Sequence, residues 1–262
     1  MRFNSDQIQK IGKEISSKVD GKTLFDEFSR GRYSTDASVY QIKPLGVVLP
    51  KDTNDVLSLM EYSQKNSVPL LARGGGSSQC GQTVGESVVL DYSKHQNKIL
   101  ELNVEEKYVW VQPGVVLDHL NDYLKPHGLW FPVDVSTSSR ATIGGMSANN
   151  SCGSRSLYYG NMVHNVLAIE AILDDGSIFN FDQINKNYLA TKNNQDRLYK
   201  IIDKFIDVRQ QVGGEIDANW PTTQRRVGGY NIDLIDPEGF NSSNLLVGSE
   251  GTLSLFLSLI HI

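Results

Sequence analysis

The chain is poor in cysteine, has no excess of positive charge and contains no long hydrophobic run. Only Cys80 and Cys152 occur, without a C-x-x-C pair, which excludes a thiolate zinc site or a self-contained iron–sulfur site in this segment. No stretch reaches the roughly 18 consecutive apolar residues of a membrane span, and residues 1–20 lack the apolar core of a signal peptide. We therefore expect a cytoplasmic protein with no membrane span and no metal site.

The charge balance also argues against nucleic acid as a partner. The 262 residues carry a formal net charge of −5, so the chain has no general attraction for polyanions. Any anionic ligand must be met by donors gathered in particular loops. With 39% hydrophobic residues, the chain is long enough to bury a core and to fold without disulfides.

The apolar periodicity predicts an α+β fold. Isoleucines at helical spacing predict a helix over residues 6–17, with Asp6 as its N-cap. A β-α-β unit is expected over residues 47–72, and its helix is expected to start at Pro50. Further on, the pattern predicts strands at 88–91, 99–102 and 108–111, a helix over 116–124, a hairpin turning at 174–177, a loop over 185–194, a helix from 198 to 213, and core strands at 245–247 and 252–257.

The first glycine-rich loop runs from Arg73 through Gly74, Gly75 and Gly76 to Ser77 and Ser78. Glycines allow consecutive backbone N–H groups to turn toward one point, which favours phosphate binding, although the same three glycines also suit a plain turn. A G-x-G-x-x-G fingerprint fails at Gln79, and a P-loop fails at Gln82, where lysine is required. A nucleotide triphosphatase is therefore disfavoured.

A second loop-like segment covers residues 131–153. It is rich in small hydroxyl and amide side chains, contains the run Thr142, Ile143, Gly144, Gly145, and carries almost no charge. Such a segment is unsuited to a core but can wrap closely around a polar ligand. Two glycine loops in this order point to a dinucleotide rather than to an isolated turn.

Together these motifs resemble the FAD-binding domain of the vanillyl-alcohol oxidase and p-cresol methylhydroxylase type, as found in FAD-linked D-2-hydroxy acid dehydrogenases. The resemblance extends from about residue 33 to 255 and includes the segments 32–38, 111–115, 159–161 and 247–253. The sequences of residues 76–85, 125–134 and 150–156 most resemble those of long bacterial flavoproteins with an iron–sulfur module. These flavoproteins are similar to D-2-hydroxyglutarate and D-lactate dehydrogenases.

The resemblance implies a two-subdomain fold and a set of cofactor-binding residues. It implies a helical arm over 1–42 and an FAD-binding domain over 43–262, divided into subdomains 43–113 and 114–262. Covalently flavinylated members have histidine where this chain has Ser77, so FAD is expected to be non-covalent. The implied FAD contacts are Arg73, Gly74, Gly75, Gly76, Ser77, Ser78, Gly81, Gln82, Pro113, Asp134, Ser136, Thr137, Ser138, Thr142, Ile143, Gly144, Gly145, Asn149 and Gly153.

Several other residues have both a chemical and a structural interpretation. The cysteines are expected to be small buried thiols, and His127 and His164 to be structural rather than proton acceptors. Glu250 is expected in a turn that touches the cofactor, with its carboxylate bonding locally. An arginine in the segment 225–231 could pair a substrate carboxylate, although a solvated loop charge is slightly favoured.

The implied activity is oxidation of a D-2-hydroxy acid to the 2-oxo acid, with electrons passing to an acceptor outside this segment. No catalytic residue is assigned, because the base and the carboxylate-binding groups of the family belong to a later domain, so we expect an N-terminal fragment. An iron–sulfur cluster is expected only in a missing C-terminal part. Two alternatives stay open: a non-catalytic nucleotide or phosphate-binding module, and a flavin reductase of the UDP-N-acetylenolpyruvylglucosamine reductase type.

Overall fold

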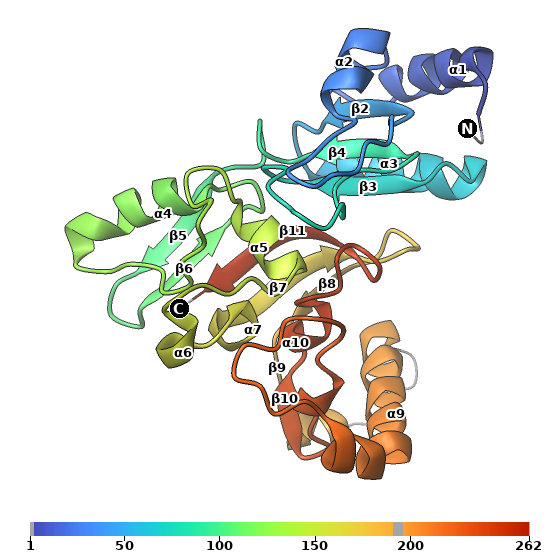
Figure 1. Cartoon of the computed structure of the whole chain (residues 1–262). Helices are drawn as coiled ribbons and strands as arrows, with labels where there is room; N and C mark the ends of the chain where they lie inside the picture. Colours follow the sequence, from blue (N-terminus) through green and yellow to red (C-terminus); the bar gives the residue numbers. More distant parts are fainter. Residues whose placement is uncertain (1–2, 191–195, 262) are drawn as a thin grey trace.

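The computed structural model of the chain describes residues 3–190 and 196–261. Figure 1 shows one layer at the top, built from the N-terminal residues, and a second layer below it, with a smaller helical part beside the second layer. The layers contain a four-stranded and a five-stranded sheet, and the helical part contains a two-stranded ribbon. The α+β fold expected from the sequence is confirmed. Of the loop expected over 185–194, residues 191–194 lie outside the described part.

The first layer is formed by α1 (Ser5–Ser16), β1 (Lys22–Leu24), α2 (Glu27–Arg32), β2 (Gly46–Leu49), α3 (Thr53–Asn66), β3 (Leu70–Arg73) and β4 (Val88–Asp91). The strand order is β1-β2-β4-β3, with β1 antiparallel and the other neighbours parallel. The predicted β-α-β unit is present as β2, α3 and β3, but β4 lies between its two strands. The helix α3 begins at Thr53 rather than at Pro50, because the Asp52 side chain accepts hydrogen bonds from the N–H groups of Asn54 and Asp55.

The segment expected as a separate arm over 1–42 contributes to this first layer. Helix α1 is capped by Asn4 rather than Asp6, through a reciprocal capping box with Gln7. Its isoleucines, at 8, 11 and 15, are buried in the same core as α3 and β4, and β1 pairs with β2. The arm is therefore part of the first layer, because its apolar face needs this sheet for burial.

The second layer contains β5 (Ile99–Asn103), β6 (Tyr108–Val111), α4 (Leu117–Leu124), the 3-10 turn η1 (Lys125–His127), α5 (Ile143–Ala148), α6 (Ser156–Tyr159), α7 (Met162–Asn165), β7 (Val166–Ile172), β8 (Ile178–Phe181) and β11 (Leu255–His261). The sheet is antiparallel, in the order β5-β6-β11-β7-β8. Since β5 and β6 precede residue 113 yet belong here, the boundary between the sheets does not coincide with the expected subdomain boundary. The predicted turn at 174–177 joins β7 to β8, with Gly176 at φ +82°.

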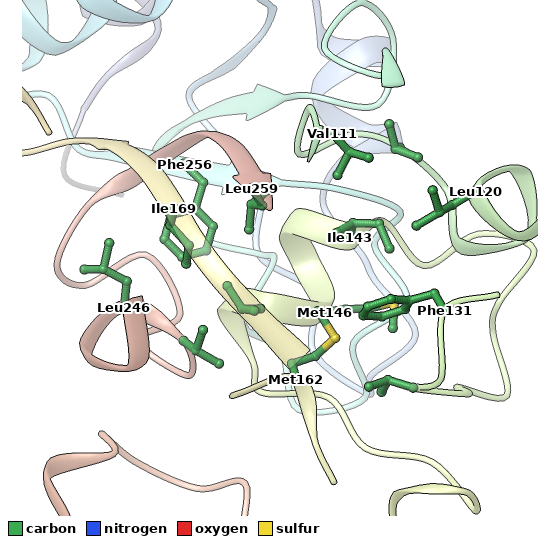
Figure 2. Close-up of a cluster of buried hydrophobic side chains, with 14 of the residues drawn as sticks. Val111, Leu120, Phe131, Ile143, Met146, Met162, Ile169, Leu246, Phe256 and Leu259 are labelled. Carbon is green, nitrogen blue, oxygen red and sulfur yellow. The ribbon is translucent and has the colours of Figure 1, made fainter. Parts of the chain in front are cut away.

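The core of the second layer lies between the sheet and the helices α4 and α5. Figure 2 shows Ile143 and Met146 of α5 among side chains from several other elements, including Leu120, Phe131 and Ile169. Ile143, Leu120 and Ile169 are fully buried. Helix α5 is short, so this packing rather than helix propensity holds it in place. The second glycine-rich loop is thereby fixed at the start of α5.

The remaining elements form the smaller helical part. They are β9 (Gln183–Asn185), α8 (Lys186–Ala190), α9 (Arg197–Asn219), η2 (Ile232–Leu234), β10 (Gly239–Asn241) and α10 (Ser243–Leu246). Three sequence predictions are wrong here. The loop expected from residue 185 is replaced by the end of β9 and by helix α8 over its described residues. Helix α9 continues through Gly213 and Gly214, since Ile216 extends its buried face. Residues 245–247 are not a strand, because the backbone turns in α10 while Leu245 and Leu246 remain buried.

Candidate functional site

A cavity of about 430 Å³ lies where both glycine-rich loops meet the turn before β11. Strand β3 leads into the first loop, β4 is followed by Tyr92, and the turn at 250–254 leads into β11. The lining consists of Leu70, Leu71, Ala72, Arg73, Gly74, Gly75, Gly76, Ser77, Ser78, Gln79, Cys80, Gln82, Thr83, Tyr92, Pro113, Val135, Ser136, Thr137, Ala141, Thr142, Gly144, Gly145, Met146, Ala148, Asn149, Ser151, Cys152, Glu250, Gly251, Ser254, Leu255 and Phe256. Segments from both layers therefore build one site.

The first loop presents a run of free backbone donors. Within the described part of the chain, the N–H groups of residues 74–79 have no hydrogen-bond acceptor, although all six residues line the cavity. Gly76 has φ +63°, a conformation that glycine adopts without strain. Consecutive N–H groups left free in a loop form the kind of concave donor set that binds anions. The expected nest is thus consistent with the structure.

Glycine is required in this loop because the two loops are in contact. A Cβ atom at Gly74 would lie 2.0 Å from Thr142 Oγ1, and one at Gly75 would lie 2.2 Å from the Arg140 carbonyl oxygen. Both distances are far below van der Waals contact. The first loop therefore packs directly on the second.

The second loop is held by the start of α5 and by the segment after β6. Thr142 caps α5, its Oγ1 accepting from the Gly145 N–H at 3.3 Å. The Gly144 N–H donates to the Pro113 carbonyl at 2.8 Å, and a Cβ at Gly144 would lie 2.5 Å from Pro113 Cβ. This close contact brings Pro113 to the cavity wall.

The Arg73 side chain serves the protein framework. Its guanidinium donates to the carbonyl oxygens of Thr35 at 2.8 Å, Thr83 at 3.1 Å and Tyr33 at 3.3 Å, and it lies 5.3 Å from the centre of the Tyr33 ring. Arginine suits this role because its planar fork carries five donors. The segment before β2 is thereby attached to both ends of the first loop.

Most of the predicted contacts line the cavity, and a few lie outside its wall. Ile143 is fully buried in the core of the second layer. Asp134 accepts from Ser154 Oγ at 2.6 Å and from the Arg155 N–H at 2.9 Å; burial opposes ionisation of its carboxyl, but these hydrogen bonds hold its pKa below the usual value. The predicted residues outside the wall are Gly81, Asp134, Ser138, Ile143 and Gly153.

Two buried hydroxyl groups of the cavity wall were missed by sequence reasoning. Tyr92 is 4% exposed and Ser254 is 8% exposed, and neither hydroxyl has a hydrogen-bond partner in the described part of the chain. Burial raises the pKa of Tyr92, so its phenol keeps its proton and remains a donor. An unpaired buried hydroxyl is costly, and a polar ligand in the cavity could pair both groups. Their residue types alone gave no signal.

Glu250 closes the cavity from the side of β11. Its carboxylate accepts from Gln82 Nε2 at 2.9 Å, and Gln82 also bonds to Ser78 Oγ of the first loop. The expected local bonding of this carboxylate is wrong, since its partner is 168 residues away in sequence. We call the contact between Gln82 and Glu250 the rim clasp. Glu250 has φ +51°, which is uncommon for a residue other than glycine.

His127, His164 and the two cysteines were weighed as reactive groups from the sequence, and the structure gives their surroundings. His164 Nδ1 accepts from the Asn161 N–H at 3.0 Å and so caps α7, while His127 ends the turn η1; neither lines the cavity. Both cysteines are free thiols in the cavity wall, and Cys80 is exposed, contrary to the expectation of a buried thiol. Over residues 3–190 and 196–261, the structure shows no metal-binding cluster and no helix able to span a membrane.

Comparison with protein families gives a match to this chain. The model described as "FAD binding domain" matches residues 44–182, which include both glycine-rich loops. The chain belongs to this FAD binding domain family. The expected resemblance is thereby confirmed.

Curated relatives of this FAD binding domain include D-2-hydroxyglutarate dehydrogenases. The Escherichia coli protein is 36% identical over 244 residues, and the Haemophilus influenzae protein is 35% identical over 234 residues, covering 89% and 84% of this chain. The same alignments cover only 24% and 22% of the relatives. The chain thus spans less than a quarter of their length.

A solved structure of alkyldihydroxyacetonephosphate synthase has the same fold. It covers 97% of this chain and 40% of its own length, with a TM-score of 0.67 and 18% sequence identity. At this identity the likeness concerns the fold alone. It includes the first layer, so the residues before 44 share the common architecture.

Proposed function

We propose that this chain is the FAD-holding part of a flavin-dependent dehydrogenase that oxidises a D-2-hydroxy acid to the 2-oxo acid. The observation that carries the proposal is the cavity of about 430 Å³, because one side of it offers six consecutive N–H groups that have no acceptor among the described residues. The family match and the D-2-hydroxyglutarate dehydrogenase relatives support the choice of cofactor and substrate class. When bound, FAD accepts a hydride from the carbon that bears the hydroxyl group.

We assign the pyrophosphate to the first loop. Two phosphates carry charge that the protein, at a net charge of −5, has to meet locally, and the N–H groups of residues 74–79 provide that donor set. Ser77 and Ser78 add hydroxyl groups to the same wall. The second loop, at Ser136, Thr137 and residues 142–145, forms the opposing wall for the remainder of the cofactor.

We propose that the bound FAD is non-covalent. Ser77 stands where covalently flavinylated members carry a histidine, and a serine hydroxyl does not form the corresponding bond to the flavin methyl carbon. The neighbouring thiols at 80 and 152 have no part in this proposal. The electron acceptor and the cytoplasmic location stay predictions.

The test is an absorbance spectrum of the purified chain before and after acid precipitation. We expect flavin bands near ~450 nm, with the colour released into the supernatant. A colourless protein that cannot be loaded with FAD contradicts the proposed cofactor and favours a nucleotide or phosphate-binding module. Colour that stays in the pellet contradicts only the non-covalent attachment.

A second spectrum addresses the reaction class. The full-length protein, with its flavin oxidised, is mixed anaerobically with D-2-hydroxyglutarate, D-lactate or NADPH. We expect bleaching of the flavin bands by a D-2-hydroxy acid and none by NADPH. Bleaching by NADPH alone would support the reductase of the UDP-N-acetylenolpyruvylglucosamine type.

A further inference from the structure

The loop of residues 225–231 is fixed beside the cavity, although it does not line it. The Asn161 amide donates to the Arg226 carbonyl at 3.0 Å, and the Asn231 amide donates to the Val247 carbonyl at 2.7 Å. Asn161 and Asn231 are 1% and 2% exposed, so these anchors are shielded from water. The Tyr230 hydroxyl also lies 2.8 Å from Thr252 Oγ1, in the turn that follows Gly251 of the cavity wall.

The two arginines of this loop have different surroundings. Arg226 is paired with Asp233 at 2.5 Å and lies 4.9 Å from the centre of the Trp220 ring, so its charge is compensated within the loop. Arg225 is exposed, and no carboxylate lies within ion-pair distance of it in the described residues. Its guanidinium donates to the Gly153 carbonyl at 3.3 Å, one residue beyond Cys152 of the cavity wall.

An arginine without a carboxylate partner at this position is available to a ligand. The nearby Arg155 differs, because it has Asp134 at 3.9 Å and lies over the Trp130 ring. Arg140 of the second loop is also exposed without an ion pair in the described residues, whereas the Arg225 guanidinium is in addition held against that loop by its hydrogen bond to the Gly153 carbonyl. A guanidinium binds a carboxylate through two parallel hydrogen bonds, which fixes the orientation of the acid as well as its position.

We propose that Arg225 is a specificity-determining residue that binds a carboxylate of the 2-hydroxy acid beside the cavity, in addition to the carboxylate-binding groups expected from a later domain. This inference rests on the proposed function, since it assumes an acid substrate beside the cofactor. The cofactor phosphates are a second anionic group that could use the same guanidinium. They already have the donors of residues 74–79, and Arg225 contacts the other loop.

The test compares four versions of the full-length protein: wild type, R225A, R225K and R32A. Arg32 is an exposed arginine of α2, remote in sequence from the loops, so R32A removes the same charge elsewhere. Calorimetry measures the Kd of 2-oxoglutarate and, separately, the Kd of FAD. We expect R225A to weaken 2-oxoglutarate binding about tenfold or more, R225K to weaken it less, and R32A to leave it unchanged. All four should bind FAD equally.

The two hypotheses fail in different ways. Calorimetry measures 2-oxoglutarate binding and FAD binding independently of each other. A wild-type protein that binds no FAD contradicts the proposed function. Equal 2-oxoglutarate affinity in R225A and wild type, or no 2-oxoglutarate binding by either, overturns the assignment of Arg225. A loss of FAD affinity in R225A with unchanged 2-oxoglutarate affinity also overturns it, since the guanidinium would then serve the phosphates.

Discussion

Gly75 shows how a single missing Cβ atom allows the two loops to meet. Because that atom would lie 2.2 Å from the Arg140 carbonyl oxygen, Gly75→Ala has to push the loops apart. We expect this variant to lose about 1–3 kcal/mol of folding free energy and to bind FAD more weakly. Thermal unfolding and an FAD titration measure the two effects.

The control for this variant is Gly214→Ala in helix α9. A Cβ at Gly214 meets nothing within 4 Å, and alanine favours the helix by about 0.5–1 kcal/mol. The control should therefore raise the stability and leave the FAD affinity unchanged. Destabilisation of both variants to the same extent would contradict the contact between the loops as the reason for Gly75.

The unpaired hydroxyl of Tyr92 leads to a second prediction. Tyr92→Phe removes a buried polar group that has no partner among residues 3–190 and 196–261, so the ligand-free protein should keep its stability or gain slightly. The FAD affinity should fall several-fold, because the phenol would no longer donate to the ligand. Equal FAD affinity in Tyr92→Phe and wild type, measured by fluorescence titration, would show that the hydroxyl does not face the cofactor.

At the residue scale, the sequence predicts backbone contacts better than side-chain contacts. The glycine run at 74–76 could be predicted to form a tight loop, because few other backbone conformations require three consecutive glycines. The position of Tyr92 and Ser254 in the cavity wall could not be predicted, since it depends on strands that are distant in sequence. Ile143 lies within the matched motif, yet its side chain belongs to the core, because the first residue of α5 faces inward.

At the scale of elements, the rim clasp joins the first loop to the turn before β11. Glu250→Ala removes the acceptor of the Gln82 amide, so we expect FAD to dissociate roughly two- to tenfold faster. Glu250→Gln keeps an acceptor oxygen and should release FAD at nearly the wild-type rate. Stopped-flow displacement of FAD measures both rates, and equal rates for Glu250→Ala and wild type would contradict a role of the clasp in retention.

The elements were predicted correctly where apolar periodicity was long or a turn had distinct chemistry. The isoleucines of α1 and the Asp-Gly turn at 175–176 are such cases. Three apolar residues at 245–247 could not be interpreted uniquely, because a short buried run fits a strand or one helical turn. The position of β4 between β2 and β3 also could not be predicted from the local sequence, since strand order depends on long-range pairing.

At the scale of the whole molecule, His261 predicts sensitivity to acid. It is fully buried beside Phe131, neither ring nitrogen has a hydrogen-bond partner among the described residues, and burial lowers its pKa to about 3. The unfolded chain binds this proton below a pH of roughly 6.5, whereas the folded chain does not until pH falls near 3. Stability is therefore lost as pH falls through this window, by roughly 2 kcal/mol between pH 6.5 and 5.

Replacement of this histidine tests the prediction. His261→Leu places an apolar side chain of similar size in the core and removes the titrating group. Urea unfolding at pH 7 and pH 5 should show a smaller loss of stability in the variant than in wild type. An equal loss in both proteins would mean that His261 does not cause the acid sensitivity.

Strand β11 of the second layer contributes side chains to the cores of both layers, which has a consequence for the order of events during synthesis. Leu255 and Leu257 pack in the core of the first layer, whereas Phe256 and Leu259 pack in the core of the second. In the second sheet, β11 also separates the β5-β6 pair from the β7-β8 pair. Since β11 follows all these strands in sequence, neither core is complete until residues 255–261 have left the ribosome. A nascent chain halted before Leu255 should therefore expose apolar surface of both layers and depend on chaperones.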